Sequence, residues 1–281
     1  MTAYPWPDGR AAALCVTFDL DGESPHLWRT RNNRPAGVAE LEQRRYGPRR
    51  GVEHLLAMLR RLGISSTFFV PGWIAREYPD VVRAVHADGH EIGLHGWLHE
   101  PPTDLSATEL EDTLLRSADQ IEAVTGTRPT GYRSPSWQMS LETFGVLERI
   151  GVGYDSSLMG DDRPYTVDGL CEVPVDWATD DAPYYRYVSG DARPPAFATA
   201  LVDAWRHEID SARRLGTLCM LTMHPFLSGR AARVSRLEDM LGEVIDDRLV
   251  VGRVDALAQH HSTLDGTDRS TSHTLVWPHG A

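Results

Sequence analysis

The sequence predicts a single α/β domain built around a parallel β-sheet that is closed or nearly closed. Short apolar runs rich in β-branched and aromatic residues alternate along the chain with segments of helical hydrophobic spacing. Several of the helical segments end at a glycine, which is a common stop signal. No linker, internal repeat or low-complexity tract divides the 281 residues. Alternation of this kind is typical of βα units, whose strands run parallel.

The expected strands are apolar runs, several of them bounded by Gly, Pro or Asp. They cover residues 12–18, 64–70, 90–94, 130–133, 152–154, 171–175, 217–223 and 249–254. The expected helices carry apolar residues at spacings of three and four. They cover residues 52–62, 78–87, 107–124, 141–150, 197–215 and 234–245. Ser106, followed three residues later by Glu109, is typical of a capping box that opens the third of these helices.

Two segments fit neither pattern. A polar insertion at residues 22–51 is rich in Arg, Pro and Asn. The tail from residue 258 is rich in Ser, Thr, His and Gly, and we expect it to be partly disordered or to cover a neighbouring subunit. The three cysteines, Cys15, Cys171 and Cys219, lie far apart in apolar runs and are expected to be reduced.

Composition excludes several classes of function. All 28 basic residues are arginine, so no lysine is available for a Schiff base or for a phosphate-binding P-loop. The 40 acidic residues leave a net charge of −12, which argues against nucleic acid and anionic membranes as partners. No run approaches the length of a membrane span and the amino terminus does not resemble a signal peptide, so we expect a cytoplasmic protein.

Two carboxylates stand at the end of the first apolar run. Asp19 and Asp21 are two residues apart, so on a strand both side chains point to one face. In a barrel of parallel strands, catalytic groups gather at the carboxyl ends of the strands. Because Asp is also a favoured turn residue, this pair taken alone fits a plain strand end as well.

Two histidines follow the third apolar run. The four-residue spacing of His95 and His99 lets two imidazoles converge on one ion, and it also fits a pair of packing or surface histidines. Together with Asp21 they make a three-ligand set that leaves an open position for water, as catalytic zinc sites require.

Arg133 and His224 follow later apolar runs. Arg133 is placed to hold Asp19 by a charge-assisted pair and to keep it ionised as a base, although a surface arginine on a rigid turn is the usual alternative. His224 lies at the end of a strand, where both a catalytic and a structural histidine are found.

In this order, on successive strands, these motifs resemble those of the polysaccharide deacetylase (NodB-homology) family, over roughly residues 14–224. The resemblance implies a distorted (β/α)7 barrel as one domain over residues 1–281, a divalent metal, most often zinc, and hydrolysis of non-peptide C–N amide bonds. Carried over residue by residue, the resemblance implies that Asp19 is the general base, Arg133 orients it and His224 is the general acid. It also implies a metal triad of Asp21, His95 and His99.

The resemblance also suggests residues around the reacting group. The backbone N–H of Ser136 is expected to help the metal stabilise the oxyanion. Three aromatic residues are expected to shape the substrate pocket, namely Trp137, Trp177 and Tyr165. An acid such as His224 usually needs a carboxylate neighbour, and the sequence leaves two candidates open, Asp155 and Asp176.

The motifs depart from the commoner family pattern, because Leu20 separates the two aspartates and Ser134-Pro135-Ser136-Trp137 replaces Pro-Pro-Tyr. These features look like the branch of cyclic imide hydrolases, allantoinase-like proteins and intracellular-type peptidoglycan deacetylases, typically homotetramers. We therefore expect a small cytoplasmic substrate such as a cyclic imide, a ureide or an N-acyl amine. The alternatives are an N-deacetylase of peptidoglycan or N-acetylated oligosaccharides, and an inactive metal- or sugar-binding module on the same barrel.

Overall fold

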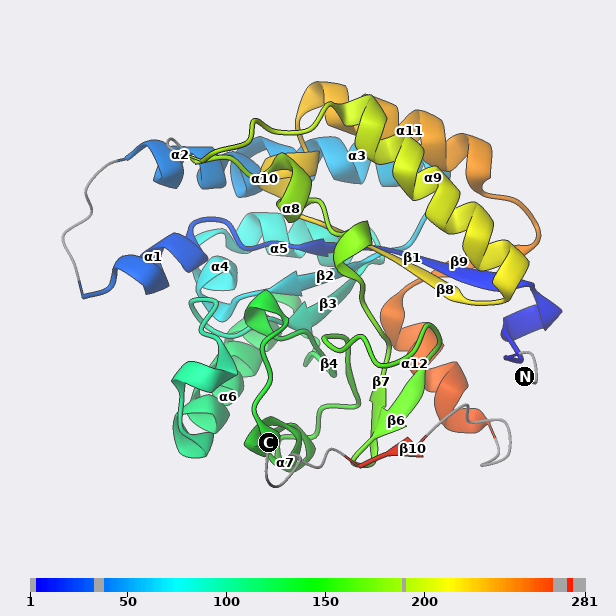
Figure 1. Cartoon of the computed structure of the whole chain (residues 1–281). Helices are drawn as coiled ribbons and strands as arrows, with labels where there is room; N and C mark the ends of the chain where they lie inside the picture. The colour runs from blue at the N-terminus through cyan, green and yellow to red at the C-terminus, as the bar shows by residue number, and fades with distance from the viewer. Residues whose placement is uncertain (1–3, 33–37, 189–190, 265–271, 275–281) are drawn as a thin grey trace.

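The computed structural model describes residues 4–32, 38–188, 191–264 and 272–274, and its strands form one curled sheet (Figure 1). Along the sheet the order is β10-β6-β7-β5-β4-β3-β2-β1-β8, and β9 pairs with β1 beside β2. The strand bounds are β1 Ala12–Asp19, β2 Thr67–Val70, β3 Glu91–Leu94, β4 Gly131–Tyr132, β5 Tyr154–Asp155, β6 Tyr165–Val167, β7 Leu170–Glu172, β8 Leu218–Met223, β9 Leu249–Gly252 and β10 Ser272–His273.

All strand pairs in the described residues are parallel, except the antiparallel hairpin of β6 and β7. The sheet curls into a partial barrel whose edge at β8 is not paired with a full strand. The chain after β7 crosses this gap, where Asp180 forms a single parallel bridge with Thr222. The distorted (β/α)7 barrel expected of a single NodB-type domain is thereby confirmed.

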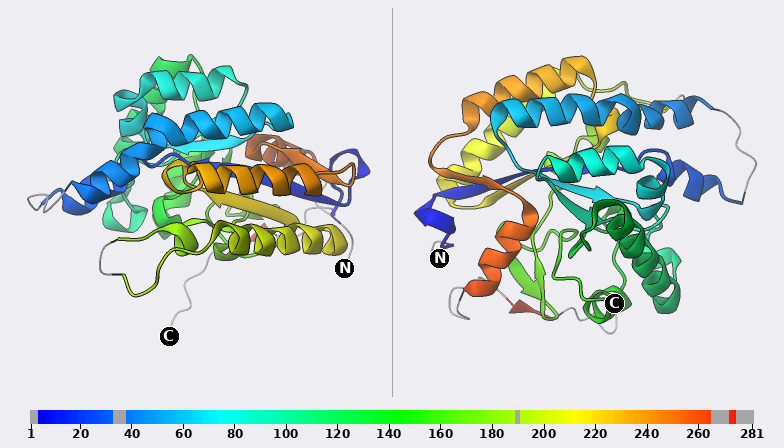
Figure 2. Two further views of the ribbon diagram at one scale, coloured as in Figure 1. Left: turned by 90° about the horizontal axis from the view of Figure 1, so that it is seen from above. Right: turned by 180° about the vertical axis from the view of Figure 1, so that it is seen from behind.

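Helices cover the outer face of the sheet, and α3, α9 and α11 run side by side over β1 and β8 (Figure 2). Helices α4, α5, α6 and α7 continue this layer around β2, β3 and β4. The helix bounds are α1 Ser24–Thr30, α2 Ala39–Tyr46, α3 Val52–Leu62, α4 Gly72–Glu77, α5 Pro79–Ala87, α6 Ala107–Thr125, α7 Leu141–Arg149, α8 Ala182–Tyr185, α9 Ala198–Leu215, α10 Pro225–Ser228, α11 Ala231–Val244 and α12 Val254–Thr263.

Strand β1 is buried on both faces, which explains its continuous apolar sequence. Alternate residues from Ala12 to Phe18 pack under the helices, whereas Ala13 and Cys15 face the barrel interior. Side chains alternate along a strand, so Asp19 shares the inner face with Cys15. The sequence of this strand therefore places a carboxylate inside the barrel at the strand's carboxyl end.

The local start and stop signals of the helices are confirmed. At the start of α6, the Ser106 hydroxyl accepts a hydrogen bond from the Glu109 backbone N–H, and the Glu109 carboxylate accepts one from the Ser106 N–H. Helices α3 and α6 end at left-handed glycines, Gly63 and Gly126. Cys15 and Cys219 are buried.

The described part of the polar insertion at residues 22–51 is largely helical. It forms α1, α2 and a π-helical turn, Gly47–Gly51, that runs directly into α3. This turn packs closely against α10, and a Cβ on Gly51 would collide with the Pro225 carbonyl oxygen. The insertion is thereby fixed beside the residue that follows His224.

The tail from residue 258 is ordered in part. Helix α12 extends to Thr263, and β10 adds a short parallel strand to β6. The rest of the predicted tail, residues 265–271 and 275–281, lies outside the described residues. No helix in the described part of the chain is long and apolar enough to cross a membrane.

Candidate active site

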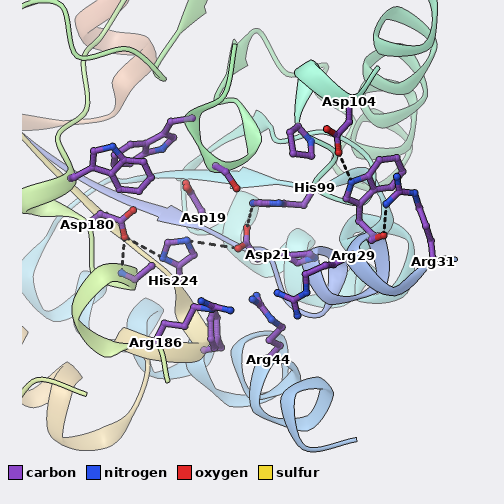
Figure 3. A pocket seen from close by; sticks show the side chains of 18 residues that line it. Asp19, Asp21, Arg29, Arg31, Arg44, His99, Asp104, Asp180, Arg186 and His224 are labelled. Carbon is purple, nitrogen blue, oxygen red and sulfur yellow. Dashed lines mark hydrogen bonds and ion pairs between the residues drawn. The ribbon is translucent and has the colours of Figure 1, made fainter. Parts of the chain in front are cut away.

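A cavity of about 520 Å³ opens at the carboxyl ends of the strands, which is a volume suited to a small molecule (Figure 3). Four of the six predicted catalytic and metal residues line it, namely Asp19, Asp21, His99 and His224. The other two, His95 and Arg133, are buried directly behind this layer and contact it. Residues from β1, β3, β4 and β8, far apart in the sequence, thus meet at one edge of the sheet.

Arg133 holds Asp19 in the barrel interior. Its Nη1 atom donates to Asp19 Oδ1 at 2.9 Å and to the Thr17 hydroxyl at 2.9 Å. Its Nε and Nη2 atoms donate to the carbonyl and hydroxyl oxygens of Ser156, each at 3.0 Å. Because the guanidinium also lies over the Phe69 ring, with Cζ 4.2 Å from the centroid, its orientation is fixed on every side. The predicted pairing of Arg133 with Asp19 is therefore present.

Asp21, His95 and His99 bring three donor atoms together. The Asp21 Oδ1 atom lies 3.3 Å from His95 Nε2 and 3.7 Å from His99 Nε2. Neither Asp21 Oδ1 nor His95 Nε2 has a hydrogen-bond partner among the described residues, although both atoms are buried. Two ligands about 2.0–2.1 Å from a tetrahedral ion are about 3.3–3.4 Å apart, so the observed spacing fits a bound cation.

The electrostatics of the triad also suit a cation. The Nδ1 atom of His95 contacts the Arg133 carbonyl oxygen at 2.7 Å, which directs the lone pair of Nε2 toward the cavity. Burial lowers the pKa of His99 to about 4 and keeps its imidazole neutral, as a metal ligand must be. Burial alone would raise the pKa of Asp21, but the neighbouring His99 and His95 imidazoles outweigh it and hold that pKa well below its usual range.

The loop after β3 is held in an unusual conformation to present His99. His99 has a left-handed backbone, with φ at 63°. The buried Glu100 carboxylate supports this loop by accepting hydrogen bonds from the backbone N–H groups of Trp97 and Leu98, each at 2.8 Å. Sequence reasoning missed Glu100, although its position directly after the second histidine was the available signal.

His224 is oriented by Asp181, which corrects the expectation that Asp155 or Asp176 supports it. His224 Nδ1 lies 2.7 Å from Asp181 Oδ1, and the His224 backbone N–H donates to Asp181 Oδ2 at 3.0 Å. Burial opposes protonation of His224, but the Asp181 and Asp180 carboxylates outweigh it and raise the pKa of His224 to about 10. The imidazole is therefore protonated at neutral pH, and its Nε2 faces the cavity side, 3.7 Å from Asp21 Oδ2.

The two carboxylates that were expected beside His224 serve local structure. Asp155, in β5, accepts a hydrogen bond from the Ser157 hydroxyl at 2.7 Å. Asp176 accepts one from the Ala178 backbone N–H at 2.7 Å and starts a 3₁₀ turn, Trp177–Thr179. The backbone after that turn bonds to β8, since the Asp181 N–H donates to the Thr222 carbonyl oxygen at 3.0 Å. This pairing across the barrel gap brings Asp181 to His224.

Three of the four predicted substrate-side residues line the cavity, and one does not. Ser136, Trp137 and Trp177 lie on its wall, and the two tryptophan rings contact each other with centroids 4.1 Å apart. Ser136 and Trp137 have left-handed backbones, with φ at 54° and 53°. The expectation for Tyr165 is wrong, because it is buried in β6 against Phe144 and Val167 and its hydroxyl accepts the Gly160 N–H.

The fold is a partial (β/α)7 barrel that brings Asp19, His224 and the donor atoms of Asp21, His95 and His99 together at one edge of the sheet. The chain belongs to the polysaccharide deacetylase family. It is 35% identical to a crystal structure assigned as a polysaccharide deacetylase from Mycobacterium smegmatis, with a TM-score of 0.90, covering 99% of this chain and 98% of that one. The polysaccharide deacetylase model of the family matches residues 46–154. The protein is accordingly a hydrolase of C–N amide bonds.

Two further proteins are similar to this chain. The peptidoglycan deacetylase of Helicobacter pylori is 25% identical over 252 residues, which cover 78% of this chain and 86% of the relative. The crystal structure of the Puue allantoinase matches with a TM-score of 0.82 over 94% of both chains, at 20% identity. At that identity the likeness to the allantoinase shows the fold alone.

Proposed function

We propose that the protein hydrolyses the amide bond of a small molecule, such as a cyclic imide, a ureide or an N-acyl amine, with a divalent metal as cofactor, most suitably zinc. The observation that carries this proposal is a pair of buried donor atoms beside His99 at the wall of the cavity. These atoms, Asp21 Oδ1 and His95 Nε2, have no hydrogen-bond partner among the described residues. The cavity volume, about 520 Å³, supports a substrate of small-molecule size.

Asp21, His95 and His99 would hold the cation. When bound there, it would supply Lewis-acid polarisation of the substrate carbonyl and lower the pKa of a coordinated water. The donor set of one carboxylate and two imidazoles suits zinc and related ions. The neutral His99 and the ionised Asp21 are in the protonation states that metal binding needs.

The remaining residues divide the proton transfers between them. Asp19 accepts a proton from the attacking water, and its hydrogen bond from Arg133 directs its other oxygen to the reaction side. The backbone N–H of Ser136 donates to the oxyanion that develops on the carbonyl oxygen. His224, protonated and held by Asp181, donates a proton from Nε2 to the leaving nitrogen. Trp137 and Trp177 pack against the substrate.

A second candidate function is N-deacetylation of peptidoglycan or N-acetylated oligosaccharides. The likeness to the peptidoglycan deacetylase of H. pylori, over most of both chains, favours it. The same base, acid and cation would serve this reaction, so the two functions differ in what the cavity wall and its mouth admit.

A panel of substrates tests the choice between them. It contains succinimide-type imides, hydantoins, allantoin, N-acylated small amines and N-acetylglucosamine oligomers, each with and without a chelator. We expect turnover of a small amide or imide that the chelator abolishes and Zn²⁺ restores. Turnover of the oligomers alone would overturn the small-substrate proposal in favour of the second candidate.

The metal assignment has its own test. We expect His99→Ala to lower the metal content of the purified protein by about tenfold or more, because one of three ligands is lost. His207→Ala, on the exposed side of α9, is the matched control and should bind metal like the wild type. Elemental analysis after dialysis measures both, and a His99→Ala protein with full metal content would refute the ligand set.

A further inference from the structure

One wall of the cavity consists of arginines. Four arginines line the cavity, and one of them, Arg31, lies over the Trp28 ring. The other three are here called the arginine wall, namely Arg29, on α1, Arg44, on α2, and Arg186, after α8. In Figure 3 the side chains of Arg44 and Arg186 stand on the opposite side of the cavity from Asp19 and Asp180. The proposed hydrolysis assigns no task to these three guanidinium groups.

Arg44 is the most constrained member of the wall. It is 5% exposed, and its guanidinium lies over the Phe226 ring with Cζ 5.0 Å from the centroid. Its Nε atom donates to Glu40 Oε1 at 3.2 Å. No described residue accepts a hydrogen bond from its Nη1 or Nη2 atoms. The Nη1 and Nη2 atoms of Arg44 can therefore donate hydrogen bonds to an acceptor inside the cavity.

Positive charge exceeds negative charge along this wall. Glu40 is shared, because it also accepts a hydrogen bond from Arg29 at 2.7 Å. Arg186 is exposed and forms no ion pair with a described acid. Glu40 and Asp21, which attracts Arg44, thus face three guanidinium groups. This excess stands out in a chain whose net charge is −12.

The acids of the cavity are engaged elsewhere. Asp19 is paired with Arg133, and Asp21 lies between the two predicted metal-ligand histidines. Asp180 accepts the Ala182 N–H at 2.7 Å and faces His224. Asp104 contacts the Trp28 indole nitrogen at 3.4 Å on the far side of the cavity from Arg186 (Figure 3). These carboxylates would repel an anion. An anionic ligand can therefore enter the cavity only if the positive charge of the arginines offsets this repulsion.

We propose that the cavity selects substrates that carry a carboxylate close to the amide bond, and that Arg44 and Arg186 bind this carboxylate. Planar guanidinium groups form paired, charge-assisted hydrogen bonds with carboxylates. Arg44 is a rigid donor, because its burial already restricts the side chain and little further conformational entropy is lost on binding. Arg186 contacts the carboxylate from the solvent side. The inference rests on the proposed function and specifies the substrate class of that same site.

Matched substrate pairs test the selection. N-acetyl-β-alanine is compared with N-propylacetamide for small amides, and N-acetylmuramic acid with N-acetylglucosamine for sugars. In each pair the first member adds a carboxylate. We expect kcat/KM to favour the acidic member of one pair by about tenfold or more. The pair that shows this preference identifies whether the carboxylate belongs to a small acid or to a muramoyl group.

Two variants connect the preference to the wall. Arg44→Gln and Arg186→Ala should each reduce the ratio of kcat/KM between acidic and neutral members by about tenfold. Arg214→Ala, an exposed residue near the end of α9, is the matched control and should leave the ratio unchanged. A wild-type enzyme that prefers the neutral members, or variants that keep the acidic preference, would overturn the inference.

Direct binding separates this inference from the proposed function. Succinate is titrated calorimetrically into the wild type and both variants, so that no turnover is needed. Weaker succinate binding in Arg44→Gln and Arg186→Ala would support carboxylate binding by these two arginines. If the variants show this loss but no substrate pair is hydrolysed, the proposed function fails and the carboxylate site remains supported. Equal succinate affinity in all three proteins would mean that the arginines only balance the charge of Asp21. That result would overturn the proposal that they bind a substrate carboxylate.

Discussion

The sheet buries carboxylates at both of its ends, and the two ends satisfy them differently. At the amino ends of the strands, both oxygens of Glu91 accept hydrogen bonds, from the Tyr154 hydroxyl at 2.6 Å, the Thr67 hydroxyl at 2.6 Å and the Asp255 N–H at 3.1 Å. At the carboxyl ends, Asp21 Oδ1 has no hydrogen-bond partner among the described residues. A buried polar group normally finds a partner, so Asp21 Oδ1 and the neighbouring His95 Nε2, which also has none among the described residues, mark a place for a ligand.

The largest effect expected at either end is that of Asp19→Asn. The amide keeps the size of the side chain but cannot accept a proton from water, so kcat/KM should fall by about 10³-fold. Glu91→Gln is the counterpart at the amino end and should leave kcat/KM within about twofold. Steady-state kinetics on the substrate found by the panel measure both. An Asp19→Asn enzyme with more than a tenth of wild-type activity would exclude Asp19 as the base.

Asp181→Asn should give the next largest effect. Asn offers only one acceptor oxygen, whereas Asp181 serves the imidazole, the backbone N–H of His224 and the Ser228 hydroxyl. We expect kcat/KM to fall by about 10²-fold, because supporting groups of this kind set the orientation of the histidine. Asp176→Asn is the control, since Asn can also cap a helical turn. Equal losses in both variants would mean that the damage is structural.

Sequence reasoning found the residues that follow strands and missed those that depend on the barrel gap. Asp19, His95 and His224 each lie within one residue of the end of an apolar run, so strand direction alone brings them to one edge. Asp181 lies after a short 3₁₀ turn in a segment without hydrophobic periodicity. Its neighbour in space, Thr222, is 41 residues away in sequence, and only the pairing of that segment with β8 connects them. No local pattern encodes such a contact.

Contacts between distant parts of the sequence also explain why the structures of the insertion and of the β6–β7 hairpin were not predicted. Residues 22–51 are too polar to show a helical stripe, yet they form α1 and α2, and α2 packs against α10. Tyr165 lies between Trp137 and Trp177 in the sequence, and its residue type does not distinguish it from these two residues of the cavity wall. The antiparallel hairpin of β6 and β7 carries it instead into a separate cluster. Side-chain type suggests the chemistry of a site, whereas long-range pairing decides which residues reach the cavity.

Glu91, at the amino ends of the strands, should contribute to how stability depends on pH. Burial raises the pKa of Glu91 to about 7, and the nearby Asp255 adds to the rise. Between pH 4.5 and 7 the folded state therefore binds more protons than the unfolded state, so the free energy of unfolding falls as pH rises through this window. Glu91→Gln removes the titration and should flatten that part of the profile. Urea unfolding at pH 5 and pH 7.5 measures it, and an unchanged slope would contradict the role of Glu91.

The smallest effect is expected from Tyr165→Phe, and it tests whether the hairpin stands apart from the cavity. The variant loses the hydrogen bond from the Gly160 N–H, at 3.1 Å, and keeps the ring in its apolar cluster. The free energy of unfolding should fall by about 0.5–1.5 kcal/mol, while kcat/KM stays within about twofold. Thermal unfolding and steady-state kinetics on one preparation give both numbers. A tenfold loss of kcat/KM at unchanged stability would mean that the phenol reaches the substrate, and the boundary of the active site would then have to include β6.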